Sequence, residues 1–258
     1  NLMSNANKFT RKGALTLITT GSVAQVEGAI VTAPALEVHA GHVSLMEANL
    51  VPAIAGSVSF GEFRFRAADS LIAGVAGSTL GLTTSGGLID IKSGGVMMID
   101  RPLDAHGGMV QLTGHGVASG KYGSVNGNGV AIYSTNGIGT AAAPLWMNTS
   151  YLRAENNQAN VANPINIRNT GELTLGAVVQ SGTGNSGSIA VENTGGMHVP
   201  AASPANEIGG RVHGSGDIKL ITHSPLTIMG EVSTTGGNIA LEAGDGGLLT
   251  VGTGAVVT

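Results

Sequence analysis

The chain has 258 residues and a net charge of −4, with 42 Gly, no Cys, 42 % hydrophobic residues, 11 % charged residues and 3 % aromatic residues. Ample apolar content with little charge excludes a disordered chain, and the negative balance argues against a nucleic-acid-binding surface. Without Cys there are no disulfides and no thiolate metal sites. No apolar run of about 18 residues occurs, so we expect no membrane-spanning helix.

Short strands in which apolar residues flank one polar or small residue recur along the whole chain. Such residues at i and i+2 point to the same face of an extended chain. In chain order, these strands are predicted at 15–17, 36–38, 43–45, 58–60, 63–65, 80–82, 89–91, 97–99, 110–112, 130–132, 165–167, 173–175, 189–191, 197–199, 218–220, 226–228, 239–241 and 249–251.

The spacing of these strands predicts the fold. Strands that begin at 165 and 173 lie 8 residues apart, and the pair returns at 189, 218 and 239 after 24, 29 and 21 residues. The gaps leave room for a third strand at Ala177–Val179 and around Val232. Three short strands and three Gly-rich turns in each coil indicate an all-β fold, a right-handed parallel β-helix or β-solenoid. Each strand then pairs with its counterpart in the next coil.

We expect residues 1–258 to form a single β-helical shaft segment. Irregular coils or loops are predicted near 19–34, 133–164 and 200–210, where the strand rhythm breaks. The chain begins at Asn1 without a signal peptide, and we expect it to be a piece of a longer protein.

Two segments resemble the repeat units of a known family. They are Asn169-Thr-Gly-Glu-Leu-Thr-Leu175, with the residues leading into it from Gly137, and Gly216-Asp-Ile-Lys-Leu220, with the residues that follow as far as Val251. Both are similar to filamentous haemagglutinin-like, β-strand-repeat exoproteins of Gram-negative bacteria, many of them exported by two-partner secretion. The resemblance is good over 129–258, loose over 80–128 and limited to strand rhythm before residue 80. The family's N-terminal secretion domain, with its Asn-Pro-Asn-Gly-type signature, is not found in this sequence. The resemblance implies an extracellular or cell-surface filament that acts in adhesion, aggregation or matrix building.

The densest polar cluster is Asp100-Arg101-Pro-Leu-Asp104-Ala-His106. Two carboxylates and a His can bind a metal or act as acid and base. The simpler interpretation, which we prefer, is a solvated corner in which Arg101 pairs with an Asp. His39 and His42 flank a turn and are likewise interpreted as solvated. We therefore predict no catalytic residues, no metal site and no cofactor.

The aromatic residues suggest a different kind of site. Tyr122, Tyr133, Trp146 and Tyr151 include every Tyr and the only Trp of the chain within 30 residues. Aromatic faces bind sugars, so Tyr133, Trp146 and Tyr151 are candidates for contact with a glycan or a protein. The alternative is that these side chains only pack against the shaft.

Three functions remain open at this stage. The first is a structural, non-enzymatic shaft segment of a secreted adhesin-like filament, whose partners would be surface glycans or other adhesin chains. The second is a self-assembling extracellular fibre or sheath subunit that stacks end to end through unpaired strands. The third is a polysaccharide-acting β-helix enzyme. Neither nucleic acid binding nor membrane insertion of this segment is expected.

Overall fold

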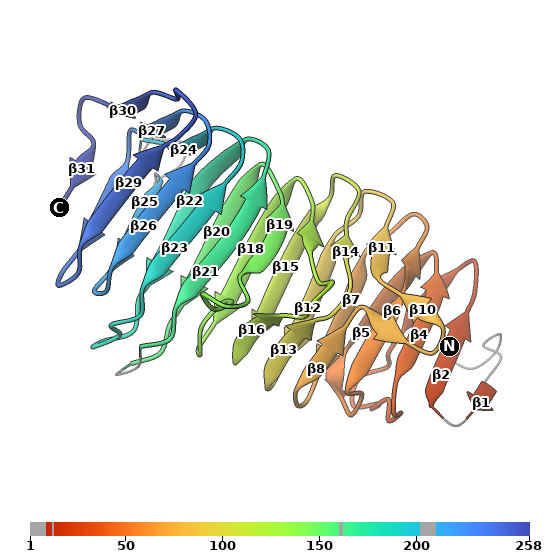
Figure 1. Cartoon of the computed structure of the whole chain (residues 1–258). Coiled ribbons are helices and arrows are strands. Elements are labelled where there is room, and N and C mark those ends of the chain that lie inside the picture. Colours follow the sequence, from red (N-terminus) through yellow and green to blue (C-terminus); the bar gives the residue numbers. More distant parts are fainter. Residues whose placement is uncertain (1–8, 12, 160–161, 202–209) are drawn as a thin grey trace. The chain divides into compact units, whose positions relative to one another are not determined.

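The computed structural model of the chain is all-β, and no helix occurs among the residues that it describes, 9–11, 13–159, 162–201 and 210–258 (Figure 1). The chain divides into two compact units, Asn1–Asn128 and Gly129–Thr258, which we call unit 1 and unit 2. The two units are described separately. The prediction of one continuous shaft segment therefore stays a prediction.

Unit 1 contains two stacks of strands, sheets A1 and B1. Sheet A1 consists of β1 (Phe9–Arg11), β2 (Ala14–Ile18), β4 (Leu36–Ala40), β6 (Ala53–Val58), β8 (Leu71–Ala73), β11 (Leu82–Thr84), β13 (Val96–Ile99), β14 (Leu103–Asp104), β16 (Gly116–Ser119) and β17 (Val125–Asn126). Sheet B1 consists of β3 (Ser22–Ala24), β5 (His42–Asn49), β7 (Phe63–Ala67), β12 (Ile89–Ser93) and β15 (Met109–Gly114). The pairings within these sheets are parallel except for β1 with β2.

The core of unit 1 is built from columns of aliphatic and aromatic side chains. On sheet B1, Phe63 pairs with Val43 on one side and Ile89 on the other, and Phe65 pairs with Leu45 and Ile91. All of these side chains are buried. The prediction that Phe63 and Phe65 belong to the core is confirmed. Burial of one such side chain stabilises the fold by about 1.5–3 kcal/mol, so each column stabilises the stacking of successive coils.

Strand β6 shows how unit 1 accommodates an insertion. Its first half pairs with β8 and its second half with β11, so one bent strand faces two strands of the next coil. Between β8 and β11 the chain inserts an antiparallel hairpin, β9 (Val75–Ala76) and β10 (Thr79–Leu80). The base of the hairpin is closed by a hydrogen bond from Gly81 N–H to Gly74 C=O, 2.6 Å long. Ala76 then packs over the buried Ala35 and Ala55.

Unit 2 repeats the same arrangement in sheets A2 and B2. Sheet A2 consists of β19 (Leu145–Asn148), β21 (Ile165–Thr170), β23 (Ile189–Asn193), β26 (Ile218–Thr222) and β29 (Ile239–Ala243). Sheet B2 consists of β18 (Gly129–Ser134), β20 (Tyr151–Asn156), β22 (Leu173–Gln180), β24 (Met197–Val199), β25 (Arg211–Gly214), β27 (Leu226–Ile228), β28 (Glu231–Thr234), β30 (Leu249–Val251) and β31 (Val256–Val257). The pairings within these sheets are parallel.

The register of unit 2 confirms the predicted coil. Ile165, Ile189, Ile218 and Ile239 pair in succession, so the predicted intervals of 24, 29 and 21 residues are the lengths of successive coils. Strand β22 pairs with both β24 and β25, because it covers two faces of its coil without a break. The third strand of each coil, predicted from Ala177–Val179 and Val232, is therefore present. The fold is a parallel β-solenoid.

The predicted irregular regions differ in outcome. Strand β3 and a single bridge from Thr32 to Leu50 order part of 19–34. Strands β18, β19 and β20 occupy much of 133–164. Of the predicted loop 200–210, residues 202–209 lie outside the described residues.

The strand predicted at 58–60 is displaced. Strand β6 ends at Val58, and Phe60 lies exposed in the following turn. A side chain built on Gly41 would overlap the Phe60 ring. The aromatic ring therefore packs over the backbone of the neighbouring coil instead of entering the core.

Candidate functional site

The three aromatic residues predicted as a contact site are not on one sheet. Tyr133 lies in β18 and Tyr151 in β20, both in sheet B2, while Trp146 lies in β19 of sheet A2. The Arg153 guanidinium stands 5.6 Å from the centroid of the Tyr133 ring. The Tyr151 hydroxyl lies against Gly176, where a Cβ would come within 2.0 Å of it. Local packing therefore accounts for both tyrosines.

Trp146 has a different environment. It is 45 % exposed, because it occupies an outward position of β19 between the buried Leu145 and Met147. In the next coil Arg168 pairs with it in register, and the guanidinium carbon lies 5.4 Å from the ring centroid. A cation over an indole ring is a favourable arrangement, which orients both side chains on the outer face of sheet A2.

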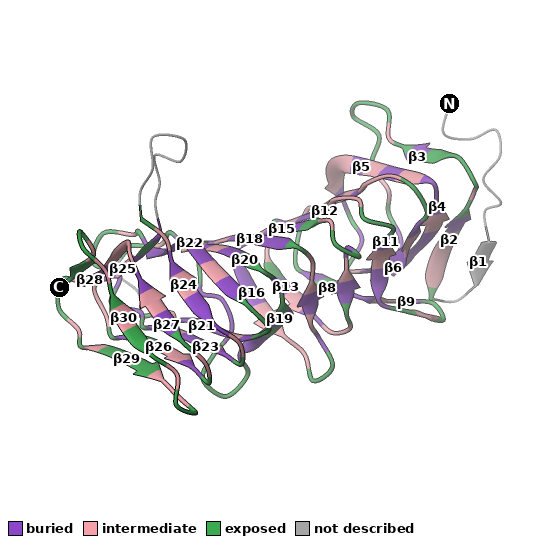
Figure 2. Ribbon diagram, turned by 90° about the horizontal axis from the view of Figure 1, so that it is seen from above, coloured by how far each residue is buried: buried purple, intermediate pink, exposed green. Residues whose placement is uncertain are grey.

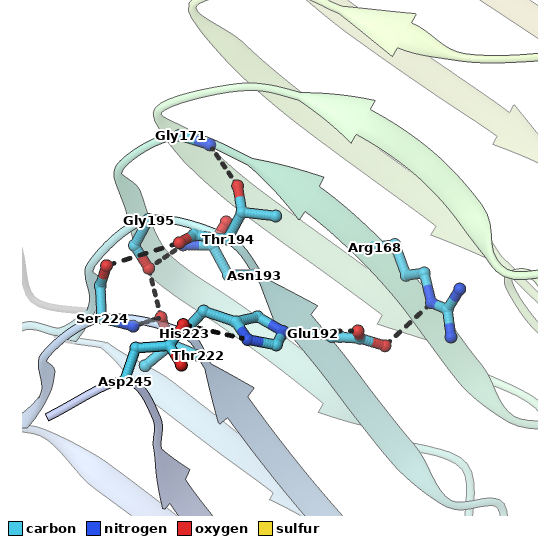
Figure 3. Close-up of polar contacts among 10 residues, drawn as sticks. All are labelled: Arg168, Gly171, Glu192, Asn193, Thr194, Gly195, Thr222, His223, Ser224 and Asp245. Carbon is cyan, nitrogen blue, oxygen red and sulfur yellow. Dashed lines mark hydrogen bonds and ion pairs between the residues drawn. The ribbon is translucent and has the colours of Figure 1, made fainter. Parts of the chain in front are cut away.

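Glu192 extends this row into a third coil. It pairs in register with Arg168, and its Oε2 lies 2.9 Å from Arg168 Nε (Figure 3). Strands β19, β21 and β23 lie side by side in Figure 1, so the three side chains form one line across the sheet. We call Trp146, Arg168 and Glu192 the outer row of sheet A2.

The outer row ends at an exposed corner. His223 Nε2 lies 3.8 Å from Glu192 Oε1, and His223 Nδ1 lies 3.7 Å from Asp245 Oδ2 (Figure 3). Asp245 sits in a turn with φ of 52°, so the segment at 243–247 is a tight turn. Opposite charges alternate along this line from Arg168 to Asp245. Because each pair is exposed, each stabilises the fold by about 1 kcal/mol or less.

Buried amides support the corner between sheets A2 and B2. Asn169 and Asn193 point inward and are almost completely buried. Asn169 Oδ1 accepts from Thr149 N–H at 3.0 Å, and Asn193 Nδ2 donates to the carbonyl groups of Gly195 and Gly196 at 2.8 and 2.9 Å. The amides thus satisfy backbone groups in turns that strands cannot pair. The interpretation of the sequence missed this role, although Asn-Thr-Gly occurs at both 169–171 and 193–195.

The polar cluster at Asp100–His106 separates into two local contacts. Arg101 Nη1 lies 2.7 Å from Asp100 Oδ2, and the Arg101 guanidinium carbon lies 4.7 Å from the centroid of the Tyr122 ring. Asp104 Oδ1 instead accepts from the backbone N–H of His106 at 2.8 Å. The predicted pairing of Arg101 with an Asp is confirmed.

His39 and His42 also lie in separate environments. His42 Nδ1 accepts from Glu62 N–H at 3.2 Å. His39 Nδ1 lies 2.8 Å from Ser57 Oγ, and its Nε2 lies 3.3 Å from Glu37 Oε1. Thr79 of the β9–β10 hairpin donates to the same Glu37 oxygen.

The carboxylate of Glu37 anchors the hairpin. Burial by itself would raise its pKa, but hydrogen bonds from Thr79, His39 and Thr16, together with the charge of His39, lower the pKa below its ordinary value. Glu37 is thus held as a carboxylate under the hairpin. We interpret this cluster as the hairpin's attachment point on sheet A1, since each of its polar atoms is used in holding β10 to β4.

No set of His, Asp and Glu side chains in the described residues is arranged to hold a metal ion. The described residues also include no helix with the length and apolarity needed to cross a bilayer. No family model, curated protein or solved structure matches this chain. The chain is described by its fold alone, as a repetitive parallel β-solenoid.

Proposed function

We propose that this chain is a shaft segment of a secreted or cell-surface filamentous protein of the filamentous haemagglutinin-like type, and that it contributes to adhesion by contacting surface glycans. The resemblance of residues 129–258 to that family supports the first part, and so does the solenoid fold. Solenoids expose long faces on which neighbouring coils present side chains in register. A structural role needs no catalytic group, and we propose none.

The observation that carries the glycan contact is the outer row of sheet A2. Trp146 offers a half-exposed indole, which combines a large apolar face with a polar N–H. Arg168 is fixed beside it by the Nε contact to Glu192, so its terminal N–H groups can donate without a large loss of side-chain freedom. The apolar side of a sugar ring suits the indole, and its hydroxyls suit the fixed Arg–Glu pair.

A binding assay on immobilised oligosaccharides tests this proposal. We expect the purified chain to bind a subset of them, and Trp146→Ala to weaken that binding at least tenfold. Tyr122→Ala is the matched control, because Tyr122 is also exposed and also lies beside a cation, Arg101. Equal losses in both variants, or unchanged binding by Trp146→Ala, would show that the outer row is not a glycan contact.

The adhesion role is tested separately with bacteria-sized beads coated with the chain. We expect coated beads to adhere to glycan-bearing cells and the Trp146→Ala coating to adhere less. Enzymatic removal of cell-surface glycans should have the same effect as the substitution. Adhesion that is insensitive to both would leave the shaft without this function.

A further inference from the structure

A second surface feature of unit 2 lies apart from the outer row. A cavity of about 330 Å³ opens where strand β22 ends, and its lining includes Ser181, Arg211, His213, Ser215 and Thr235. Its volume is at the lower end of the range for ligand-binding pockets, which suits a ligand of a single ring. The lining is polar, with several hydroxyl groups and one permanent positive charge.

Arg211 and His213 present their side chains on the same side of β25. They are two residues apart in a strand, so their Cα atoms are separated by roughly 6–7 Å. Strand β28 pairs in register with β25, and it places Glu231 opposite Arg211 and Ser233 opposite His213. The two groups most suited to ligand binding are thus both backed by side chains of the next coil.

The contacts from β28 fix the orientation of both groups. Arg211 Nε lies 3.1 Å from Glu231 Oε2, and His213 Nδ1 lies 2.7 Å from Ser233 Oγ. Among the contacts found in the described residues, none uses the terminal nitrogens of Arg211 or Nε2 of His213. The planar terminal N–H groups of an Arg match a carboxylate with two parallel hydrogen bonds.

The hydrogen-bond directions determine what His213 offers. Ser233 Oγ donates its single proton to Glu231 Oε1, since a carboxylate only accepts. Ser233 Oγ must therefore accept from His213, which places the proton on Nδ1. In the neutral imidazole, Nε2 is then an acceptor. An acceptor at this position suits a ligand hydroxyl.

We propose that this cavity binds a sugar acid of one ring, whose carboxylate pairs with Arg211 and one of whose hydroxyls donates to His213 Nε2. The hydroxyls of Ser181 and Thr235 lie in the same lining and can bond to further ring hydroxyls. The site is independent of the glycan contact proposed at Trp146, and either can fail without the other.

Calorimetric titration of the purified chain with glucuronate tests the proposal, with glucose as the matched sugar that lacks the carboxylate. We expect glucuronate to bind at least tenfold more tightly than glucose. Arg211→Gln should weaken glucuronate binding at least tenfold, since the paired charge is lost. Lys219→Gln removes the same charge from an exposed position on sheet A2 and should leave binding unchanged.

Ser233→Ala tests the orientation of His213 without removing a ligand contact. We expect a severalfold loss of glucuronate affinity, because the proton is no longer directed to Nδ1. Circular dichroism and thermal melting confirm that each variant is folded. The proposal is overturned if the folded parent chain does not bind glucuronate, if glucose binds equally well, or if Arg211→Gln binds as the parent does. Trp146→Ala should not affect this titration.

Discussion

Asn169 and Asn193 stack directly on each other inside unit 2, with Asn169 Nδ2 donating to Asn193 Oδ1 over 3.0 Å. Each amide also satisfies backbone groups of its own turn. A column of inward-facing amides therefore continues from coil to coil, beside the column of aliphatic side chains. In this corner the core is polar, and the backbone requires it, because turn carbonyls have no strand partner.

Replacing Asn193 should be costly. Asn193→Ala removes two donors from the carbonyl groups of Gly195 and Gly196, and it removes the acceptor of Asn169. We expect the free energy of unfolding to fall by about 2–3 kcal/mol, measured by urea denaturation. Asn148→Ala at an exposed outward position is the control and should change it by less than about 0.5 kcal/mol. Equal effects of both substitutions would show that the buried column has no special role.

Gly56 is the point at which β6 passes closest to the previous coil. A Cβ on this residue would lie 2.0 Å from the carbonyl oxygen of Val38, and backbone cannot move aside as a side chain can. We expect Gly56→Ala to destabilise unit 1 by about 3 kcal/mol or more, measured by thermal or urea unfolding. Gly21→Ala, whose Cβ would make only an ordinary contact at 3.7 Å, should be close to neutral. A stable Gly56→Ala variant would contradict the close approach of these coils.

The lowered pKa of Glu37 makes the attachment of the β9–β10 hairpin sensitive to acid. A carboxyl whose pKa is lower in the folded state than its ordinary value of 4.5 stabilises the fold above that value. This contribution is lost as the pH falls through the lowered folded pKa. We expect Glu37→Gln to cost about 1 kcal/mol at neutral pH and progressively less in acid, measured by unfolding at several pH values.

Hydrogen exchange localises this effect. The amide of Gly81, which closes the hairpin, should exchange faster in Glu37→Gln than in the parent chain at neutral pH. Glu27→Gln, at an exposed position, is the control for the loss of one negative charge. If Glu37→Gln unfolds with the same pH dependence as the parent, then Glu37 does not anchor the hairpin.

Asp90 should behave in the opposite way. Burial, assisted by the charge of Glu62, raises its pKa, although Lys92 and Arg64 oppose the shift. Its Oδ1 is buried and has no hydrogen-bond partner among the described residues. An acid with a raised pKa destabilises the fold where it is ionised, and the penalty disappears as the pH falls through the folded pKa towards the ordinary value of 3.8.

We therefore expect Asp90→Asn to stabilise unit 1 by up to about 1 kcal/mol at neutral pH, with a gain that vanishes in acid. Unfolding of the variant and the parent at neutral and acidic pH measures this difference. The exposed Asp69→Asn is the control for the change of net charge. A loss of stability at neutral pH would mean that the attraction from Arg64 and Lys92 outweighs the cost of burial.

The core of each coil could be predicted from the sequence because it depends on a local pattern. Alternation in Ile165–Ile167 and Ile189–Val191 states which side chains share a face, and the fixed intervals state which strands stack. Positions such as Phe63 and Phe65 followed from the same rule. The rule fails where an apolar residue follows the end of a strand, as at Phe60, because packing over Gly41 replaces pairing.

The sites depended on information that the pattern lacks. Tyr133, Trp146 and Tyr151 are close in sequence, yet successive strands carry them to different sheets, so nearness along the chain did not mean a shared surface. Conversely, Arg211, His213, Glu231 and Ser233 are brought together across coils whose lengths differ. No local motif announces such a set, since its members meet only through the register.

The sequence alone therefore determined that the chain forms a parallel β-solenoid with three strands in each coil. Alternation and interval are properties of the chain itself, and burial of aliphatic side chains makes them decisive. The tertiary structure alone decided which outward side chains meet, which amides fill the turns, and where an insertion such as the β9–β10 hairpin attaches. These contacts join residues from different coils, and their partners are fixed by the stacking register and by the bends within strands such as β6 and β22.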